Sequence, residues 1–547
     1  MLANLGKTFL CLERCTSFEK LKQIHARVFI SGIQHENYVA VKLVSFCSKT
    51  LGKIGYARMI FDTLVSSANV FLWSTMITSY SNHESEVVRE AILIYKIMNL
   101  NGPPPNDFTL SSVLKACSVL KALPEGQQVH ALSTKLGYNS SNYVLTTLLD
   151  MYAKIGLVEE SRNLFEAMHE RNVVTCNAMI ACYAKAGDME AAQNVFDKMM
   201  HKDSISWTVM ISGYASHGSI SVARKLFDQM PEKEINSWNA LITGYSHSGE
   251  WKECIHLFKE MHLRNVKPNH VTMTIAVSAT GQLGALKIAR QLHGFLHKNC
   301  IHMNAFVYNS LVDMYAKCAS IQEAYQVFSE MPIKDVVSYN VMINGFANCG
   351  HGKEALKLFP EMLEAEIEPD AVTFLGILTV CSQAGFLKLG CDYFDCMGGV
   401  YGVEPSVDHY ACIVDLLGRA GYIEQAYDLV RAMSVEPHAG VWGALLNACC
   451  TYSHVEIGEV AARELFRIEP ENPGNYVLLS NIYAKTKMWD GVKAVRCLMR
   501  GKRVTKMAGC SWIDVNGDVH EFFIGDASHA QWEEIYEALE HLSFLEI

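Results

Sequence analysis

Small polar side chains recur along this chain at a regular spacing. Asn and Thr side chains each offer a hydrogen-bond donor and an acceptor, so a row of them could read a ligand through hydrogen bonds. Each residue of the row precedes an apolar pair such as Met179-Ile180, and neighbours are separated by steps of 31 or 35 residues. The residues of the row are Asn177, Thr208, Asn239, Thr274, Asn309 and Asn340.

A period of this length predicts a solenoid of stacked helical pairs rather than one globular domain. In one unit we expect a first helix from about Val174 to Lys185, ended by Gly187, because glycine adopts positive φ easily. Asp188 then caps a second helix, whose apolar stripe is Met189, Ala192, Phe196 and Met199. The next unit repeats this stop and cap with Gly218 and Ser219 and the stripe with Ala223, Phe227 and Met230. The recurring tyrosines, such as Tyr183 and Tyr214, are expected to pack between units.

The composition narrows the classes of function. A net charge of −10, from 47 basic and 57 acidic residues, argues against a broad basic coat for non-specific nucleic-acid binding. The 18 cysteines include no C-x-x-C pattern and are expected to be reduced core residues. We predict no metal site, no cofactor, no small-molecule substrate and no membrane span. Residues 1–12 contain Lys7 and no acidic residue before Glu13, which suits a short organellar transit segment.

Three phrases carry a family resemblance: Ser206-Trp-Thr-Val-Met-Ile-Ser-Gly-Tyr214, Val312-Asp-Met-Tyr-Ala-Lys-Cys318 and Asp408-His-Tyr-Ala-Cys-Ile-Val-Asp-Leu-Leu-Gly-Arg-Ala-Gly421. They resemble the plant pentatricopeptide repeat family. The mixture of long and short units resembles its PLS subgroup. The expected fold is therefore all-α, a right-handed α-solenoid superhelix of helix-turn-helix repeats.

The resemblance implies a sequence-specific, single-stranded RNA-binding protein that reads about one base per repeat. It places base reading on the fifth residue and the last residue of each unit. The implied pairs are Ser74 with Asn106, Thr146 with Asn172, Asn177 with Asp203, Thr208 with Glu234, Asn239 with Asn269, Thr274 with Asn304, Asn309 with Asp335 and Asn340 with Asp370. The family code implies uracil at units 173–203, 305–335 and 336–370, adenine at 142–172, and a pyrimidine for Asn with Asn.

Several units depart from this code. Val41 is apolar where a polar reader is expected, and the pair Thr208 with Glu234 is unusual. Two further pairs are off-code, namely Leu375 with Ser406 and Ala411 with His438. We expect these units to contribute backbone or packing contacts and little discrimination between bases.

The C-terminal part resembles the E and E+ extensions of plant RNA-editing factors. The E-type phrases are Val441-Trp-Gly-Ala-Leu-Leu446 and Asn475-Tyr-Val-Leu-Leu-Ser-Asn-Ile-Tyr483. Asn516-Gly517, between alternating residues, predicts a short β-hairpin. The residues expected to recruit a partner are Gly509, Cys510, Ser511 and Trp512. A basic run could contact RNA phosphate, or be a solvated helix face or a docking patch; its residues are Lys493, Arg496, Arg500, Lys502, Arg503 and Lys506.

A cytidine deaminase domain needs H-x-E and C-x-x-C patterns to hold its zinc and its acid/base glutamate. The one H-x-E in these 547 residues is His454-Val-Glu456, which we interpret as ordinary helix surface. We therefore predict a protein that is not itself an enzyme. The partner expected in trans is a deaminase-bearing pentatricopeptide repeat protein or another editing cofactor.

The resulting domain prediction has four parts. Residues 1–36 form an N-terminal segment with a partial repeat and a short transit peptide, and 37–438 form the tandem repeats. Residues 439–505 form the E-type repeats, and 506–547 the E+ hairpin and a terminal helix. The leading functional prediction is a site-recognition factor for organellar C-to-U RNA editing, in the mitochondrion or alternatively the chloroplast. The alternatives are an organellar RNA stabilisation, splicing or translation factor, and a protein-binding helical-repeat scaffold.

Overall fold

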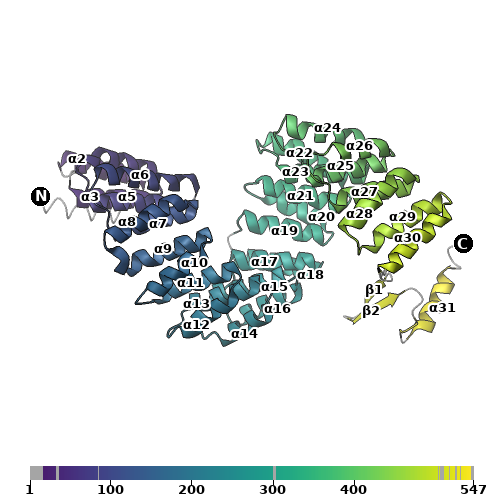
Figure 1. Cartoon of the computed structure of the whole chain (residues 1–547), viewed down its shortest axis with the longest axis horizontal. Helices are drawn as coiled ribbons and strands as arrows, with labels where there is room; N and C mark the ends of the chain where they lie inside the picture. The colour runs from purple at the N-terminus through teal and green to yellow at the C-terminus, as the bar shows by residue number, and fades with distance from the viewer. Residues whose placement is uncertain are drawn as a thin grey trace. The chain divides into compact units, whose positions relative to one another are not determined.

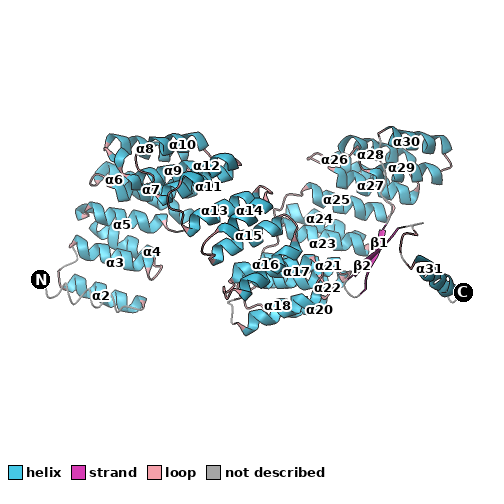
Figure 2. Ribbon diagram, turned by 90° about the horizontal axis from the view of Figure 1, so that it is seen from below, coloured by secondary structure: helices cyan, strands magenta, loops and turns pink. Residues whose placement is uncertain are grey.

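The protein is described by a computed structural model that covers residues 17–32, 36–83, 85–299, 303–502, 504, 510–515, 518–523, 527–529 and 531–543. It divides into two compact parts, residues 1–279 and residues 280–547. Helices make up almost all of both, as Figure 1 and Figure 2 show.

In residues 1–279 each repeat contributes a first and a second helix, and first helices pack on the first helices of neighbouring repeats. The first helices are α3 (Asn37–Lys49), α5 (Val70–Ser81), α7 (Asp107–Leu120), α9 (Asn142–Ile155), α11 (Val173–Ala186), α13 (Ser204–Ser216) and α15 (Ile235–His247). The first helix α17 (His270–Gln282) spans the boundary between the two parts. The second helices are α2 (Phe18–Ile30), α4 (Ile54–Leu64), α6 (Arg89–Asn101), α8 (Leu123–Lys135), α10 (Val158–Ala167), α12 (Met189–Lys198), α14 (Ile220–Gln229) and α16 (Trp251–Leu263). Short 3₁₀ turns are η1 (Val65–Ser67), η2 (Ser85–Val88) and η3 (Tyr138–Ser140).

Residues 280–547 continue the same pattern. The first helices are α19 (Ala305–Lys317), α21 (Val336–Asn348), α23 (Ala371–Ala384), α25 (Val407–Arg419), α27 (Ala439–Tyr452) and α29 (Pro473–Lys485). The second helices are α18 (Leu286–Lys298), α20 (Ile321–Glu330), α22 (Gly352–Glu364), α24 (Leu387–Gly399), α26 (Ile423–Ala432), α28 (Val455–Ile468) and α30 (Trp489–Gly501). Strands β1 (Cys510–Val515) and β2 (Asp518–Phe523) pair antiparallel, and α31 (Trp532–Ser543) follows.

The unit at 173–203 forms as its sequence predicts. Helix α11 ends at Gly187, which has a φ of 86° and donates its N–H to Ala184 O. Asp188 then caps α12 by accepting the backbone N–H of Ala191 at 2.9 Å. In the next unit Ser219 occupies the predicted cap position of α14, but its side chain makes no cap bond.

The apolar stripes of the second helices form the core between repeats. Ala192, Phe196 and Met199 are buried, and so are Ala223, Phe227 and Met230 in the following unit. The recurring tyrosines join neighbouring repeats, as predicted: Tyr214 Oη donates to Gln193 Oε1 at 3.0 Å, and Tyr152 Oη lies 3.0 Å from His130 Nδ1. Buried side chains therefore follow one another from repeat to repeat, as expected when each repeat buries its faces on its neighbours.

The cysteines whose side chains the structure describes are not joined in disulfides, and most of them are buried. Burial is the main cause that raises the pKa of Cys117, Cys254, Cys381 and Cys449 to about 12, so these side chains are neutral packing groups. Within the described ranges, no helix has both the length and the apolar character needed to cross a membrane. The same residues contain no group of three or more His, Cys, Asp or Glu side chains placed to hold a metal ion.

Glycine on the first helices allows neighbouring helices to approach closely. A Cβ added at Gly244 would lie 2.5 Å from Ala215 Cβ and 2.9 Å from Ile220 Cδ1. We therefore expect Gly244→Ala to destabilise the protein by about 1–3 kcal/mol through overpacking. Gly443 on α27 has open space around it, so Gly443→Ala should be neutral or slightly stabilising. Chemical denaturation of the two variants checks this, and equal midpoints would contradict the packing account.

Candidate functional site

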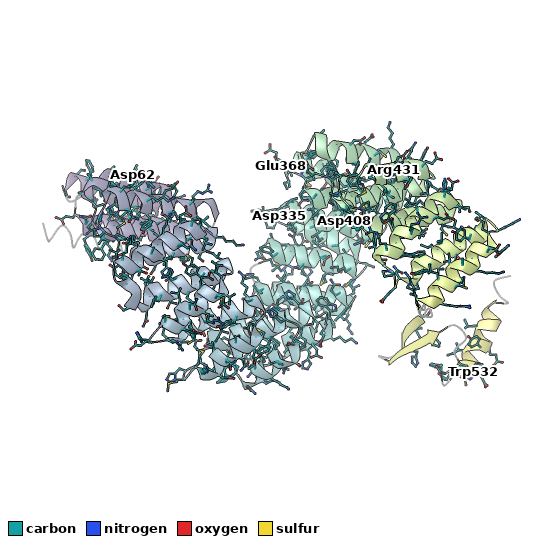
Figure 3. All side chains as sticks on the ribbon, in the orientation of Figure 1. Asp62, Asp335, Glu368, Asp408, Arg431 and Trp532 are labelled. Carbon is teal, nitrogen blue, oxygen red and sulfur yellow. The ribbon has the colours of Figure 1, made fainter. Side chains whose placement is uncertain are left out.

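The last residue of each unit stands at the start of the next first helix. Asp203, Asp335 and Asp370 are the N-cap residues of α13, α21 and α23, and each accepts backbone and side-chain hydrogen bonds from the third residue of its helix. Figure 3 labels Asp335. The N-cap residues Asn106, Asn172 and Asn304 likewise accept a backbone N–H with their side chains. Helix capping thus fixes the place of these predicted readers.

The fifth residue of a unit lies on the preceding first helix and meets this cap. Asn177 Nδ2 donates to Asp203 Oδ1 at 3.0 Å. Asn340 Nδ2 donates to Asp370 Oδ1 at 2.9 Å, and Asn239 Nδ2 donates to Asn269 Oδ1 at 3.3 Å. The Asn309 side chain lies close to the Asp335 carboxylate and helps to lower the pKa of that carboxyl. Residues about 30 positions apart in the sequence are thus brought together as hydrogen-bonded pairs.

The pairs with a hydroxyl at the fifth position are arranged differently. Ser74 Oγ lies 3.3 Å from Asn106 Oδ1, whereas Thr146 reaches Asn172 through the hydroxyl of Thr175. Thr208 donates to Ser204 O at 2.7 Å, and the Glu234 side chain makes no cap bond. Within the part of the chain that the structure describes, no hydrogen bond joins Thr208 to Glu234. Thr274 lies in residues 1–279 and Asn304 in residues 280–547. Thr274 Oγ1 donates to His270 O at 2.8 Å.

The acidic caps are held in the ionised form. Burial alone would raise the pKa of Asp335, but hydrogen bonds from the backbone and hydroxyl of Ser338 and from Asn309 lower the pKa below its ordinary value. The same balance lowers the pKa of Asp203 and of Asp370. At neutral pH each of these three units therefore presents a carboxylate, which is a hydrogen-bond acceptor only.

Two features of this surface were missed by the sequence analysis. The first is a hydroxyl three residues after the last residue of a unit, on Thr109, Thr175, Ser206, Thr272, Ser338 and Thr373. Each of these hydroxyls hydrogen-bonds to the side chain of the cap residue. The recurrence of Ser or Thr three positions after Asn or Asp, as in a capping box, could have revealed this set.

The second missed feature is a row of exposed apolar side chains, which stand at the second residue of most first helices. Each stands three residues before the fifth position, so it shares the helix face of the predicted reader. The row consists of Tyr38, Phe71, Phe108, Tyr143, Val174, Ile205, Val271, Phe306, Val337 and Val372. Apolar residues at exposed positions in one register are a sign of a binding surface. The row is interrupted at Asn236 and ends before Asp408.

The hydroxyl three residues after the cap residue also distinguishes two kinds of Asn pair. Thr272 Oγ1 donates to Asn239 Oδ1, and Thr373 Oγ1 donates to Asn340 Oδ1, both at 2.6 Å. Asn177 Oδ1 and Asn309 Oδ1 are buried and have no hydrogen-bond partner within the part of the chain that the structure describes. A buried, unpaired acceptor costs about 1–3 kcal/mol, so these two amides are less firmly held.

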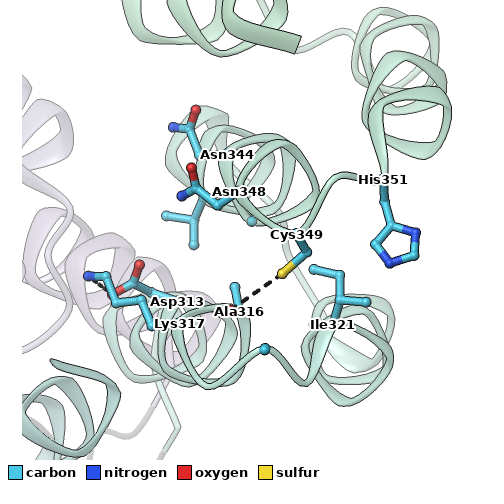
Figure 4. Close-up of a pocket in the computed structure, with 11 residues that line it drawn as sticks. Asp313, Ala316, Lys317, Ile321, Asn344, Asn348, Cys349 and His351 are labelled. Atoms are coloured by element: carbon cyan, nitrogen blue, oxygen red, sulfur yellow. Dashed lines mark hydrogen bonds and ion pairs between the residues drawn. The ribbon is translucent and has the colours of Figure 1, made fainter. Parts of the chain in front are cut away.

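The off-code units lack such pairs. Val41 packs against the hydrophobic core. His438, the last residue of its unit, caps α27. Its Nε2 lies 2.9 Å from Oδ1 of Asp408, which is the second residue of the unit, and not beside the fifth residue, Ala411. At the opposite ends of α19 and α21, a pocket of about 400 Å³ is lined by Asp313, Ala316, Lys317, Ile321, Asn344, Asn348, Cys349 and His351 among others (Figure 4). None of the predicted readers lines it.

The predicted recruiting residues are partly described. Gly509 lies outside the described residues, and so does the Asn516-Gly517 turn; Cys510, Ser511 and Trp512 lie on β1. Trp512 is opposite Glu521 in the antiparallel register. In the basic run, Lys493, Arg496, Arg500 and Lys502 are exposed on or just after α30, while Arg503 and Lys506 also lie outside the described residues.

Comparison with known sequences shows the family. Models of the PPR repeat family match residues 171–203, 233–281 and 334–383, and a PPR repeat model matches 143–173, 205–235 and 306–336. The E motif model matches residues 452–514. A pentatricopeptide repeat-containing protein of Arabidopsis thaliana is 40% identical over 97% of this chain and 81% of its own length. The chain belongs to the pentatricopeptide repeat family and carries an E motif.

Other relatives match the chain over most of its length, and two solved structures have a similar fold. A chloroplastic member from A. thaliana is 32% identical over 98% of this chain and 79% of its own length. A chloroplastic/mitochondrial member from the same plant is 33% identical over 97% of this chain and 76% of its own length. Maize PPR10 has a similar fold, with a TM-score of 0.56 at 15% identity over 91% of this chain and 78% of that one. PPR10 in complex with an 18-nt psaJ RNA element gives a TM-score of 0.58 at 16% identity, covering 91% of this chain and 74% of that chain.

Proposed function

We propose that this protein binds single-stranded organellar RNA sequence-specifically and is a site-recognition factor for C-to-U editing. The observation that carries the RNA-binding part is the set of hydrogen-bonded pairs, formed by the fifth residue of one unit and the cap of the next. The pairs of Asn177 and Asn340 stand beside an exposed apolar residue of the same helix face, whereas Asn236 holds that position beside Asn239. Apolar and aromatic side chains can stack on or flank a base, while the polar pair contacts its edge.

The pairs then define a base pattern in unit order. From 142–172 to 336–370 we propose adenine, uracil, an unassigned base, a pyrimidine, an unassigned base, uracil and uracil. The unassigned positions belong to 204–234, whose unusual pair Thr208 and Glu234 is not joined by a hydrogen bond in the described part of the chain, and to 270–304, whose pair is Thr274 with Asn304. In the carboxylate units, ionised Asp supplies an acceptor that favours a base presenting an N–H, as uracil does. We also propose that the stacked repeats wind as a right-handed superhelix.

The C-terminal module is proposed to recruit the editing deaminase. This rests on the match of residues 452–514 to the E motif and on the resemblance of the residues after it to the E+ stretch. The C-x-x-C pattern that completes the zinc site of a cytidine deaminase is not found in the sequence of residues 1–547, and the one H-x-E, His454-Val-Glu456, has no such partner, so we place the catalytic site outside this stretch. We propose that another protein supplies it, and that exposed Lys493, Arg496 and Arg500 contact either RNA phosphate or that protein.

We propose an organellar location, because close relatives are named chloroplastic or chloroplastic/mitochondrial. The mitochondrion is our first choice and the chloroplast the alternative. The second candidate function, RNA stabilisation, splicing or translation, uses the same paired surface and is less favoured because of the E motif. A protein-binding scaffold is the third candidate, and it gives no reason for paired polar readers to recur in register.

Sequencing of organellar transcripts from a knockout line tests the editing proposal. Loss of editing at one or a few sites, restored by the wild-type gene, is the expected result. Unchanged editing with altered transcript ends or retained introns would favour the second candidate. No binding of purified protein to any single-stranded RNA would favour the scaffold.

A further inference from the structure

The hydroxyl residue at the third position of the next first helix behaves differently depending on whether it is Thr or Ser. In all four units where it is Thr, its hydroxyl contacts the fifth-position side chain. These contacts join Ser74 to Thr109 at 2.6 Å, Thr146 to Thr175 at 2.8 Å, Asn239 to Thr272 at 2.6 Å and Asn340 to Thr373 at 2.6 Å.

Where the residue is Ser206 or Ser338, its hydroxyl donates to the carboxylate of the cap residue and not to the fifth-position side chain. Ser206 Oγ donates to Asp203 Oδ1 at 2.7 Å, and Ser338 Oγ donates to Asp335 Oδ1 at 2.8 Å. The fifth-position carbonyls of these two units, Asn177 Oδ1 and Asn309 Oδ1, are left buried without a partner among the described residues. The cap does not decide this difference, because Asp370 is also an aspartate and yet is followed by Thr373.

The hydroxyl oxygen lies in the same place in both kinds of Asn unit, because it accepts the backbone N–H of the cap residue at 3.3 Å in Ser206, Ser338 and Thr272 and at 3.1 Å in Thr373. What differs is the nearest acceptor for the hydroxyl proton, which is the fifth-position amide oxygen in the Thr units and the cap carboxylate in the Ser units. A hydroxyl has one proton to donate. Thr373 Oγ1 lies 2.6 Å from Asn340 Oδ1 and 3.0 Å from Asp370 Oδ1, so the shorter contact is to the fifth-position amide.

We propose that Thr at this position is a positioning residue that fixes the reading amide and thereby sets how strongly the unit distinguishes uracil from cytosine. This inference rests on the proposed function. The amide Nδ2 of Asn177 donates to the cap of its Ser unit, as the amides of Asn239 and Asn340 do in their Thr units. In the Thr units, Thr adds a second anchor at Oδ1. Turning the amide over therefore breaks one hydrogen bond in a Ser unit and two in a Thr unit.

The orientation of the amide matters because uracil and cytosine present reversed patterns of donors and acceptors on their pairing edges. An amide that turns over easily can satisfy either pyrimidine, whereas a doubly anchored amide favours one. Units 305–335 and 336–370 carry the same Asn and Asp pair but differ in Ser338 and Thr373. They are neighbours, so one RNA tests both.

The experiment exchanges the two hydroxyl residues, with Thr373→Ser in one full-length variant and Ser338→Thr in another. A randomised single-stranded RNA pool first locates the adjacent uracils bound by the wild type. Oligonucleotides with cytosine at one or the other position then give the uracil-to-cytosine affinity ratio for each unit. One neutral hydrogen bond corresponds to a change of about 2- to 12-fold in that ratio.

We expect Thr373→Ser to lower the ratio at the 336–370 position only, and Ser338→Thr to raise it at the 305–335 position only. Thr373→Val, which keeps the backbone cap bond from residue 373, should act like Thr373→Ser. Unchanged ratios in the exchanged variants, or equal changes at both positions, would overturn the inference while leaving RNA reading intact. A wild type with no uracil preference at any position would overturn the proposed function as well.

Discussion

Replacing Asn309 by Thr, with Asp335 left in place, is expected to shift the base preference of unit 305–335 from uracil toward guanine. The family resemblance implies guanine for Thr with Asp, and the Asn309 side chain lies close enough to Asp335 to lower the pKa of that carboxyl. The substitution removes the amide donor and acceptor and leaves the ionised carboxylate, which accepts from a base N–H. The change in discrimination should be about 1–3 kcal/mol, typical of a well-read base.

Affinities for oligonucleotides that differ only at this base provide the measurement. Thr208→Asn is the matched control, because its unit ends in Glu234, which makes no side-chain cap bond. We expect little change of preference from that variant. If Asn309→Thr weakens binding to all four bases equally, the pair stabilises the repeat without reading the base.

Replacing Phe306 by Ala should weaken binding to every RNA sequence by about 1–3 kcal/mol, the value of one stacking contact between a base and an aromatic ring. The Phe306 side chain is 74% exposed on α19, three residues before Asn309. An exposed ring contributes little to folding, so the loss should fall on RNA binding. The uracil preference of the unit should stay the same, because stacking does not distinguish donors from acceptors.

Ile333 supplies the control in the same unit. It is 81% exposed but lies in the spacer before the cap residue, outside the row of second-position residues. Ile333→Ala should leave RNA affinity unchanged, as measured by fluorescence anisotropy on the same oligonucleotides. Equal losses for the two variants would show that exposed apolar area in general, rather than this row, contacts the RNA.

Much of the fold follows from the repeat period. The stop at Gly187, the cap at Asp188 and the stripe through Phe196 depend on local backbone preferences and on one apolar face, which are readable in the sequence. The pairing of Asn177 with Asp203 follows from register once the family is recognised. Ser219 departs because occupying a cap position does not oblige a side chain to make the cap bond.

The remaining features depend on three-dimensional packing. Phe306 and Val337 look like core residues in the sequence, and only the exposed position of the second helical residue shows otherwise. The side chains of Thr373 and Ser338 differ by one methyl group. The shortest hydrogen bond of the Thr373 hydroxyl goes to the amide oxygen of Asn340, whereas that of the Ser338 hydroxyl goes to the carboxylate of Asp335. That difference depends on the distance to an amide on another helix, which no local pattern encodes.

Selection of bound sequences from a randomised single-stranded RNA pool by the full-length protein tests the central claim most directly. The account predicts enrichment of adenine, uracil, any base, a pyrimidine, any base, uracil and uracil, read in either direction. The adjacent uracils should be the strongest part of the pattern. Binding with no enriched bases, or enrichment that does not change with Asn309→Thr, would contradict the claim that these pairs read RNA.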